Sequence, residues 1–117
     1  MSDEFTVLPW GNEGVQVLKV KHLWSEAANK EILAAVQTKI DEGFANFVAD
    51  LAEAPYINSV GLNLLIHIMM RTKENGGKLI ISNASAKVLQ LFEVTKLIPM
   101  FELAPSTEEA VAQIVNN

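Results

Sequence analysis

The chain has 117 residues, of which half are hydrophobic and a fifth are charged, the balance of one folded domain rather than of a disordered segment. Its formal net charge of −5 argues against a nucleic-acid partner, because the overall field repels a phosphate backbone. It contains no cysteine, which excludes disulfides, thiolate metal sites and cysteine nucleophiles. We therefore expect a single domain over residues 1–117.

The N-terminus and the apolar stretches bear on where the protein works. The first four residues, 1–4, are acidic at the point where a secretory signal is basic, and no long apolar run follows them. The most apolar stretch, residues 60–70, contains Asn63 and His67 and is shorter than the roughly 18 residues that span a bilayer. These features predict a cytoplasmic protein that does not insert into a membrane.

Strands and a helix are predicted in the first part of the chain. Residues 5–10 and 15–23 are β-branched or apolar runs on either side of a glycine-containing loop, and they predict a hairpin. Pro9 predicts an edge position for the first strand, since proline has no N–H to offer a neighbouring strand. Ser25 then precedes apolar residues at helical spacing, and Gly43 closes that segment. An antiparallel strand pair followed by an amphipathic helix is therefore expected.

The rest of the chain predicts an alternation of strands and helices. These further elements are strands over 47–51, 79–81 and 100–103, and helices over 60–75 and 85–96. A last helix begins at Ser106, and Glu109 three residues later completes the pattern of a capping box. The predicted fold class is therefore α/β, with a mixed, mainly parallel β-sheet packed with four α-helices.

The segment around Ser59 carries the main functional signal. It joins a predicted buried strand to a predicted helix, at the edge of the sheet where loops after parallel strands form binding surfaces. One interpretation is that Ser59 only caps the helix, which stabilises by about 1 kcal/mol. The other is that an exposed hydroxyl at a helix N-terminus accepts a phosphoryl group, whose charge the helix dipole tolerates. Residue spacing leaves both interpretations open.

Apolar side chains near Ser59 indicate a partner surface. At about 100° per residue, Val60 and Met70 fall on the polar, solvent-facing stripe of the predicted helix rather than on its core face. Trp24 lies in a loop at the same edge of the sheet. It either contacts a partner, since tryptophan is enriched at binding hot spots, or packs under the first helix.

Four segments follow one another in an order typical of one family. They are Phe47-Val48-Ala49-Asp50-Leu51, Asn58-Ser59-Val60-Gly61-Leu62, Gly76 to Asn83 and Glu108 to Val111. The order is strand, turn, a motif close to Asp-Ser-x-Gly-Leu, apolar helix, Gly-Gly and strand. Over nearly its whole length the chain resembles a STAS domain of the anti-sigma-factor antagonist type.

This resemblance implies a non-catalytic binding protein that works without a cofactor. In the family, a partner that is both anti-sigma factor and serine kinase phosphorylates the serine of the motif, and a serine phosphatase removes the phosphate. The unphosphorylated form binds the kinase and so frees the sigma factor. Ser59 has the position of that serine, which makes it the expected phosphorylation site. The expected partner-binding residues are Asn58, Ser59, Val60, Gly61, Asn63 and Trp24.

The sequence departs from the family pattern at two places. The aspartate of the motif is Asn58 here, which removes a charge beside the phosphate acceptor and changes what a kinase recognises. A glycine common at the end of the second strand is also missing, and residues 21–24 stand in its region.

Two other functions are weighed against the switch. The first is a constitutive STAS adaptor in a signalling assembly or transport complex, in which Ser59 is only a helix cap, and Asn58 favours it. The second is a small enzyme that uses Ser59 with one histidine. Against the enzyme, position 57 is Ile where a Gly-x-Ser-x-Gly motif needs glycine, and the two histidines lack a zinc-site spacing.

Overall fold

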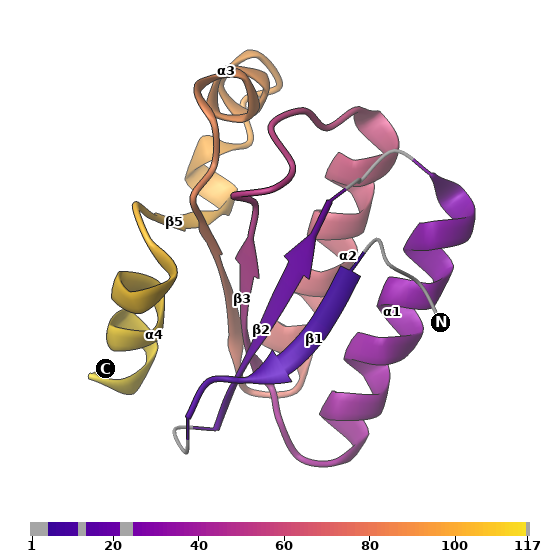
Figure 1. Ribbon diagram of the computed structural model, residues 1–117, viewed down its shortest axis with the longest axis vertical. Coiled ribbons are helices and arrows are strands. Elements are labelled where there is room, and N and C mark those ends of the chain that lie inside the picture. Colours follow the sequence, from indigo (N-terminus) through magenta and orange to yellow (C-terminus); the bar gives the residue numbers. More distant parts are fainter. Residues whose placement is uncertain (1–4, 12–13, 22–24, 117) are drawn as a thin grey trace.

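The computed structural model describes residues 5–11, 14–21 and 25–116 of the chain. Its elements follow in the order β1 (Phe5–Pro9), β2 (Val15–Val20), α1 (Glu26–Asp41), β3 (Asn46–Asp50), α2 (Ser59–Glu74), β4 (Lys78–Ser82), α3 (Ala86–Val94), the 3-10 helix η1 (Ile98–Met100), β5 (Glu102–Ala104) and α4 (Thr107–Val115). The strands form a 5-stranded sheet in the order β1-β2-β3-β4-β5 (Figure 1). β1 is antiparallel to β2 and the other pairs are parallel, which confirms the predicted α/β class.

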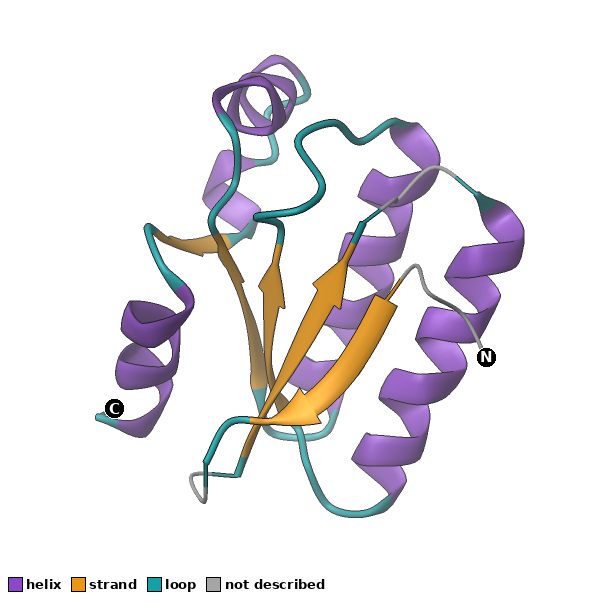
Figure 2. Ribbon diagram, in the orientation of Figure 1, coloured by secondary structure: helices purple, strands orange, loops and turns teal. Residues whose placement is uncertain are grey.

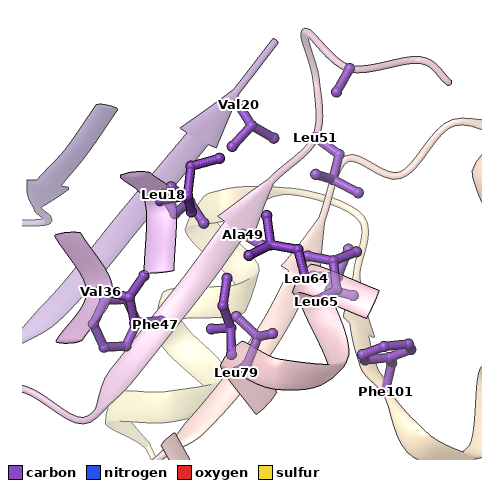
Figure 3. Close-up of a cluster of buried hydrophobic side chains, with 14 of the residues drawn as sticks. Leu18, Val20, Val36, Phe47, Ala49, Leu51, Leu64, Leu65, Leu79 and Phe101 are labelled. Atoms are coloured by element: carbon purple, nitrogen blue, oxygen red, sulfur yellow. The ribbon is translucent and has the colours of Figure 1, made fainter. Parts of the chain in front are cut away.

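Helices cover both faces of this sheet (Figure 2). Residues Phe47 and Ala49 of β3 point into the larger core, among side chains of α1 and α2 such as Val36 and Leu64 (Figure 3). Val48, between them, points into the smaller core formed with α4. Because β3 is buried on both faces, its sequence is a continuous apolar run rather than an alternating one. This is the pattern from which the strand was predicted.

Serine side chains begin three of the helices. The hydroxyl of Ser25 accepts the N–H of Ala28 at 3.3 Å, and that of Ser106 accepts the N–H of Glu109 at 3.2 Å. Ser85 caps α3 in the same way. The Glu109 carboxylate accepts a hydrogen bond from the Ser106 hydroxyl at 3.3 Å instead of reaching the Ser106 backbone N–H. The predicted helix start is confirmed. The second hydrogen bond of a capping box, from the backbone N–H of the serine to the glutamate, is replaced by the hydrogen bond between the two side chains.

Predicted and observed boundaries differ by two residues or more at β2, β5 and α3, and α3 ends at Val94 rather than at the predicted residue 96. β2 ends at Val20, short of the predicted residue 23, and residues 22–24 lie outside the described part of the chain. The strand predicted over 100–103 is wrong at its start, because Met100 belongs to η1 and β5 begins at Glu102. Pro99 explains the difference, since its fixed φ and missing N–H suit the first turn of a helix better than a strand.

Glycines shape the ends of α1 and α2. Gly43 and Gly76 have φ values of 103° and 83°, in the left-handed region, directly after the last helical turns. At Gly77 the requirement is space: a Cβ there would overlap the backbone carbonyl of Ala45. The start of β4 therefore packs against the start of β3 backbone to backbone. Within the described residues, no helix has both the length and the apolar character needed to cross a membrane.

We predict that Gly77→Ala lowers the free energy of unfolding by about 1–3 kcal/mol, because the added methyl group meets main-chain atoms that cannot rotate away. Urea unfolding followed by circular dichroism measures the change. Adding Ala45→Gly should not restore stability, because the obstacle is the carbonyl of residue 45 rather than its side chain alone. A Gly77→Ala protein with an unchanged urea midpoint contradicts this packing.

Candidate functional site

The candidate site lies where the carboxyl ends of the parallel strands meet. β3 ends at Asp50, and the β3–α2 loop (residues 51–58) carries the chain from there to the start of α2 (Figure 1). The segment from Asn83 to Ser85, which follows β4, lies at the same edge. Residues far apart in sequence therefore surround the N-terminus of α2.

Asn58, not Ser59, caps α2. The Asn58 Oδ1 atom accepts the N–H of Gly61 at 3.1 Å, and Ser59 is the first residue of the helix. The expectation that Ser59 serves as the cap is therefore wrong. Asparagine and aspartate cap helices about equally well, so the departure from the family motif at this position keeps the cap and removes only the charge.

The Ser59 side chain is exposed at the first position of α2. Among the described residues, its hydroxyl has no hydrogen-bond partner. The first turn of α2 contains no acidic residue. The unpaired N–H groups and the helix dipole therefore give this end of the helix a partial positive charge without a carboxylate of the first turn to cancel it. Chemically, the position suits an added anionic group.

The other predicted contact residues differ in exposure. Asn58 and Asn63 are exposed, as a contact surface requires, but Gly61 is buried and contributes its N–H to the cap. Val60 is half-buried rather than fully exposed. Met70 is 49% exposed, but it lies about 16 Å farther along the helix axis than Ser59 and belongs to another part of the surface.

Val60 and Asn63 line a groove of about 280 Å³ between α1 and α2. The α1 side of the groove includes Glu26 and Asn29. The Asn29 Nδ2 atom donates a hydrogen bond to the Val60 carbonyl at 2.9 Å, which ties α1 to the first turn of α2. The surface around Ser59 therefore continues onto α1 through a fixed contact.

A buried carboxylate holds the beginning of the β3–α2 loop. Asp50 is 7% exposed, and its Oδ1 atom accepts the N–H of Ala52 and the Nδ2–H of Asn83, both at 3.0 Å. Asn83 has a φ of 57° and also lies 3.4 Å from the Thr107 hydroxyl, which is hydrogen bonded to Ser82 at 2.8 Å. The loop is thus linked to the end of β4 and the start of α4.

The middle of the loop is held by the start of α3. The Ser85 hydroxyl donates to the Pro55 carbonyl at 2.7 Å while it accepts the N–H of Val88. The Lys87 ammonium lies 5.1 Å from the centroid of the Tyr56 ring, within the range of a cation–π contact. The loop before Ser59 and the first turn of α3 therefore form one continuous surface.

The structure does not support the enzyme and metal alternatives in the part that it describes. His67 lies on α2 about 12 Å from Ser59 along the helix axis, too far for a hydrogen bond between the two side chains. His22 and Trp24 lie outside the described residues, so the predicted contact by Trp24 remains a prediction. No group of three or more His, Asp or Glu side chains within the described ranges could hold a metal ion.

Sequence reasoning missed the residues that fix the loop. In the structure Glu53 is exposed, while Asp50 is hydrogen bonded to Asn83, which lies 33 residues later in the sequence. The available signal was strand order, because parallel pairing of β3 and β4 places Asp50 beside Ser82 at the edge of the sheet.

Comparison with known proteins agrees with this geometry. The model of the STAS domain family matches residues 11–110. The chain belongs to the STAS domain family. Among curated proteins, BtrV of Bordetella bronchiseptica, named as a candidate anti-sigma factor antagonist, is 24% identical over 100 residues, which cover 86% of each chain.

Solved STAS structures share the fold at low sequence identity. A candidate anti-sigma factor antagonist from Thermotoga maritima superposes with a TM-score of 0.82 at 16% identity, covering 94% of this chain and 93% of that one. SpoIIAA in its unphosphorylated form gives 0.78 at 20% identity and 97% coverage of both chains. The phosphorylated form of SpoIIAA from Bacillus gives 0.71 at 21% identity, with 94% and 98% coverage.

We predict that Asn58→Ala lowers the free energy of unfolding by about 1 kcal/mol, because it removes the cap of α2. Asn58→Asp should keep the stability, and Ser59→Ala should change it little, because the cap bond comes from residue 58. Thermal and urea unfolding of the three variants measure these differences. A larger loss for Ser59→Ala than for Asn58→Ala would contradict the assignment of the cap.

A second prediction concerns the buried carboxylate. Asp50→Ala should cost about 1–3 kcal/mol, because it leaves the Ala52 N–H without its acceptor and removes the shorter of the two hydrogen bonds that the Asn83 amide donates. Hydrogen exchange at Ala52 should accelerate in the same variant. Glu53→Ala, which removes an exposed carboxylate from the same loop, is the matched control and should stay within about 0.5 kcal/mol of the wild type. Equal effects of the two substitutions would contradict the proposed role of Asp50.

Proposed function

We propose that this STAS domain is an anti-sigma factor antagonist that binds an anti-sigma factor through the surface around Ser59 and is switched by phosphorylation of that serine. The partner's kinase activity adds the phosphate and a serine phosphatase removes it. The protein acts in the cytoplasm without a cofactor and without catalysis of its own. BtrV and the Thermotoga maritima protein are named as candidate antagonists of this kind, which supports the proposal.

One observation carries the proposal. Ser59 is exposed at the first position of α2, while the neighbouring Asn58 makes the cap bond that a serine at a helix start usually makes. The fold therefore does not need the Ser59 hydroxyl. A side chain that the fold does not need can gain and lose a phosphoryl group without unfolding the helix that presents it.

Phosphorylation would act on the complex through charge. It adds about −1.5 to −2 charges at the centre of the proposed contact surface. A partner surface that buries the neutral hydroxyl must then remove water from a dianion. The free energy of this desolvation exceeds the free energy gained from contacts, unless the partner provides a cation for the phosphate. The same phosphate is tolerated in the free protein, because it lies in water at the positive end of α2.

The test uses the partner that the native protein brings down from its own cells. Ser59→Asp should weaken that complex at least about tenfold, or about 1.4 kcal/mol, because it places a charge in the interface. Ser59→Ala should bind as tightly as the wild type. Ala112→Asp is the charge control, since Ala112 is exposed on α4 at the other face of the sheet. Titration calorimetry with the purified partner measures all four proteins.

The intact mass of the native protein separates the switch from a constitutive adaptor. The switch requires a phosphorylated fraction that disappears in Ser59→Ala. An unmodified protein, together with a stable complex that Ser59→Asp does not weaken, would overturn the switch and leave a STAS adaptor that uses the same surface. Asn58 in place of an acidic residue is the feature that favours this second function.

A further inference from the structure

β1 is an edge strand whose only protecting residue is Pro9 at its end. Within the described part of the chain it pairs with β2 alone (Figure 2), and its sequence from Phe5 to Pro9 contains no charged residue. Natural sheets usually guard such edges with lysine, proline, inward-pointing charges, bulges or very short strands, and of these β1 has a proline at its last position, Pro9. The opposite edge, β5, spans only three residues and carries Glu102. The less protected edge is therefore on the β1 side.

The register shows which main-chain groups face outward. The Trp10 N–H donates to the Val15 carbonyl at 2.8 Å, in line with the antiparallel register that pairs Leu8 with Val17. Hydrogen-bonded and non-hydrogen-bonded pairs alternate along an antiparallel ladder. The N–H and C=O groups of every second residue from Phe5 to Pro9 therefore point away from β2. Pro9, which has no N–H, fits this outward-facing set.

A groove of about 650 Å³ runs beside this edge, between β1 and α1. The strand side of the groove includes Phe5 and Val7, which are half-buried. Its helix side includes Ala34 and Ala35, whose side chains are small. On the other face of the strand Leu8 is 60% exposed. The open edge thus has apolar surface on both faces.

We infer that β1 pairs antiparallel with β1 of a second copy of this chain, around a two-fold axis at Val7. The Val7 N–H of each copy then donates to the Val7 carbonyl of the other, and the Phe5 N–H of each copy donates to the Pro9 carbonyl of the other. Leu8 lies across from Thr6 of the second copy, and its exposed side chain is partly covered. The pairing is isologous, as in most homodimers, and it joins two sheets into one.

Charged residues on α1 favour pairing with a second copy of this chain over pairing with a strand of an unrelated protein. Glu31 and Lys39 both line the groove, and they lie about one helical turn before and after Ala35. A two-fold axis reverses the direction of α1 in the second copy. Each Glu31 is then directed toward the Lys39 of the other copy, so the groove is complementary to itself. Such exposed pairs add little affinity but favour one register and one partner.

This surface is separate from the site around Ser59, since β2 lies between β1 and the strand that leads to that serine. Pairing at β1 does not depend on the proposed function. Binding of an anti-sigma factor at Ser59 and pairing at β1 can therefore be tested one without the other.

The experiment is sedimentation equilibrium of the full chain from low micromolar to millimolar concentration, where a reversible dimer is expected. Val7→Pro should abolish it, because proline removes the central outward donor, while no described residue of the monomer accepts that N–H. Val7→Ile is the matched control and should dimerise as the wild type does. Circular dichroism and urea unfolding of each variant verify the fold.

Charge-reversal variants test pairing at β1 without introducing a proline. Glu31→Lys and Lys39→Glu should each weaken the dimer several-fold, and the double variant should restore it, because the pairs across the axis are re-formed. A protein that stays monomeric at millimolar concentration overturns the inference. A dimer whose affinity is unchanged by both Val7→Pro and the charge reversals overturns the inference too, because such a dimer would use another face.

Discussion

Parallel pairing on both sides of β3 is the constraint on which the rest of the structure depends. β3 is the centre of the sheet, and its side chains Phe47 and Val48 are fully buried on opposite faces. Both faces must therefore be covered, and a parallel connection requires a crossover, here a helix each time. The strands β2, β3 and β4 consequently end at one edge. The segments after these strands meet there, and Ser59 begins the helix after the middle one.

The polar contacts at that edge make the loop before Ser59 part of a rigid surface. Asp50 holds its beginning, and Ser85, the N-cap of α3, holds its middle at Pro55. The helix α3 is itself anchored by Phe92, whose ring centroid lies 5.0 Å from that of Phe101 in the core. A partner that binds a surface already ordered does not have to order a loop, so less of the contact energy is lost. The exposed hydroxyl is presented by a scaffold that does not depend on it.

Apolar patterns in the sequence predicted most of the helices and strands. The features that were not predicted depend on how several of these elements are arranged in space. The amphipathic helices were found because their apolar residues recur at helical spacing, and the buried strands because they are short continuous apolar runs. The 3-10 helix η1 was missed, because three residues show no periodicity. The cap of α2 was placed one residue late, since Asn58 and Ser59 are both good caps and the loop decides between them. The contacts of Asp50 depend on the register of β3 with β4, and the groove beside β1 depends on the small residues of α1.

A neutral cap changes what a phosphate does at the start of α2. With an aspartate at position 58, a phosphoryl group on Ser59 would face a like charge at the adjacent residue, and the repulsion would weaken the cap itself. With Asn58 the cap bond to Gly61 carries no charge, and no acidic residue stands in the first turn. If Ser59 is phosphorylated as proposed, the modified and unmodified forms would therefore differ less in their own stability. Discrimination between them then depends on the surface of the partner, which must accept a hydroxyl and reject a dianion.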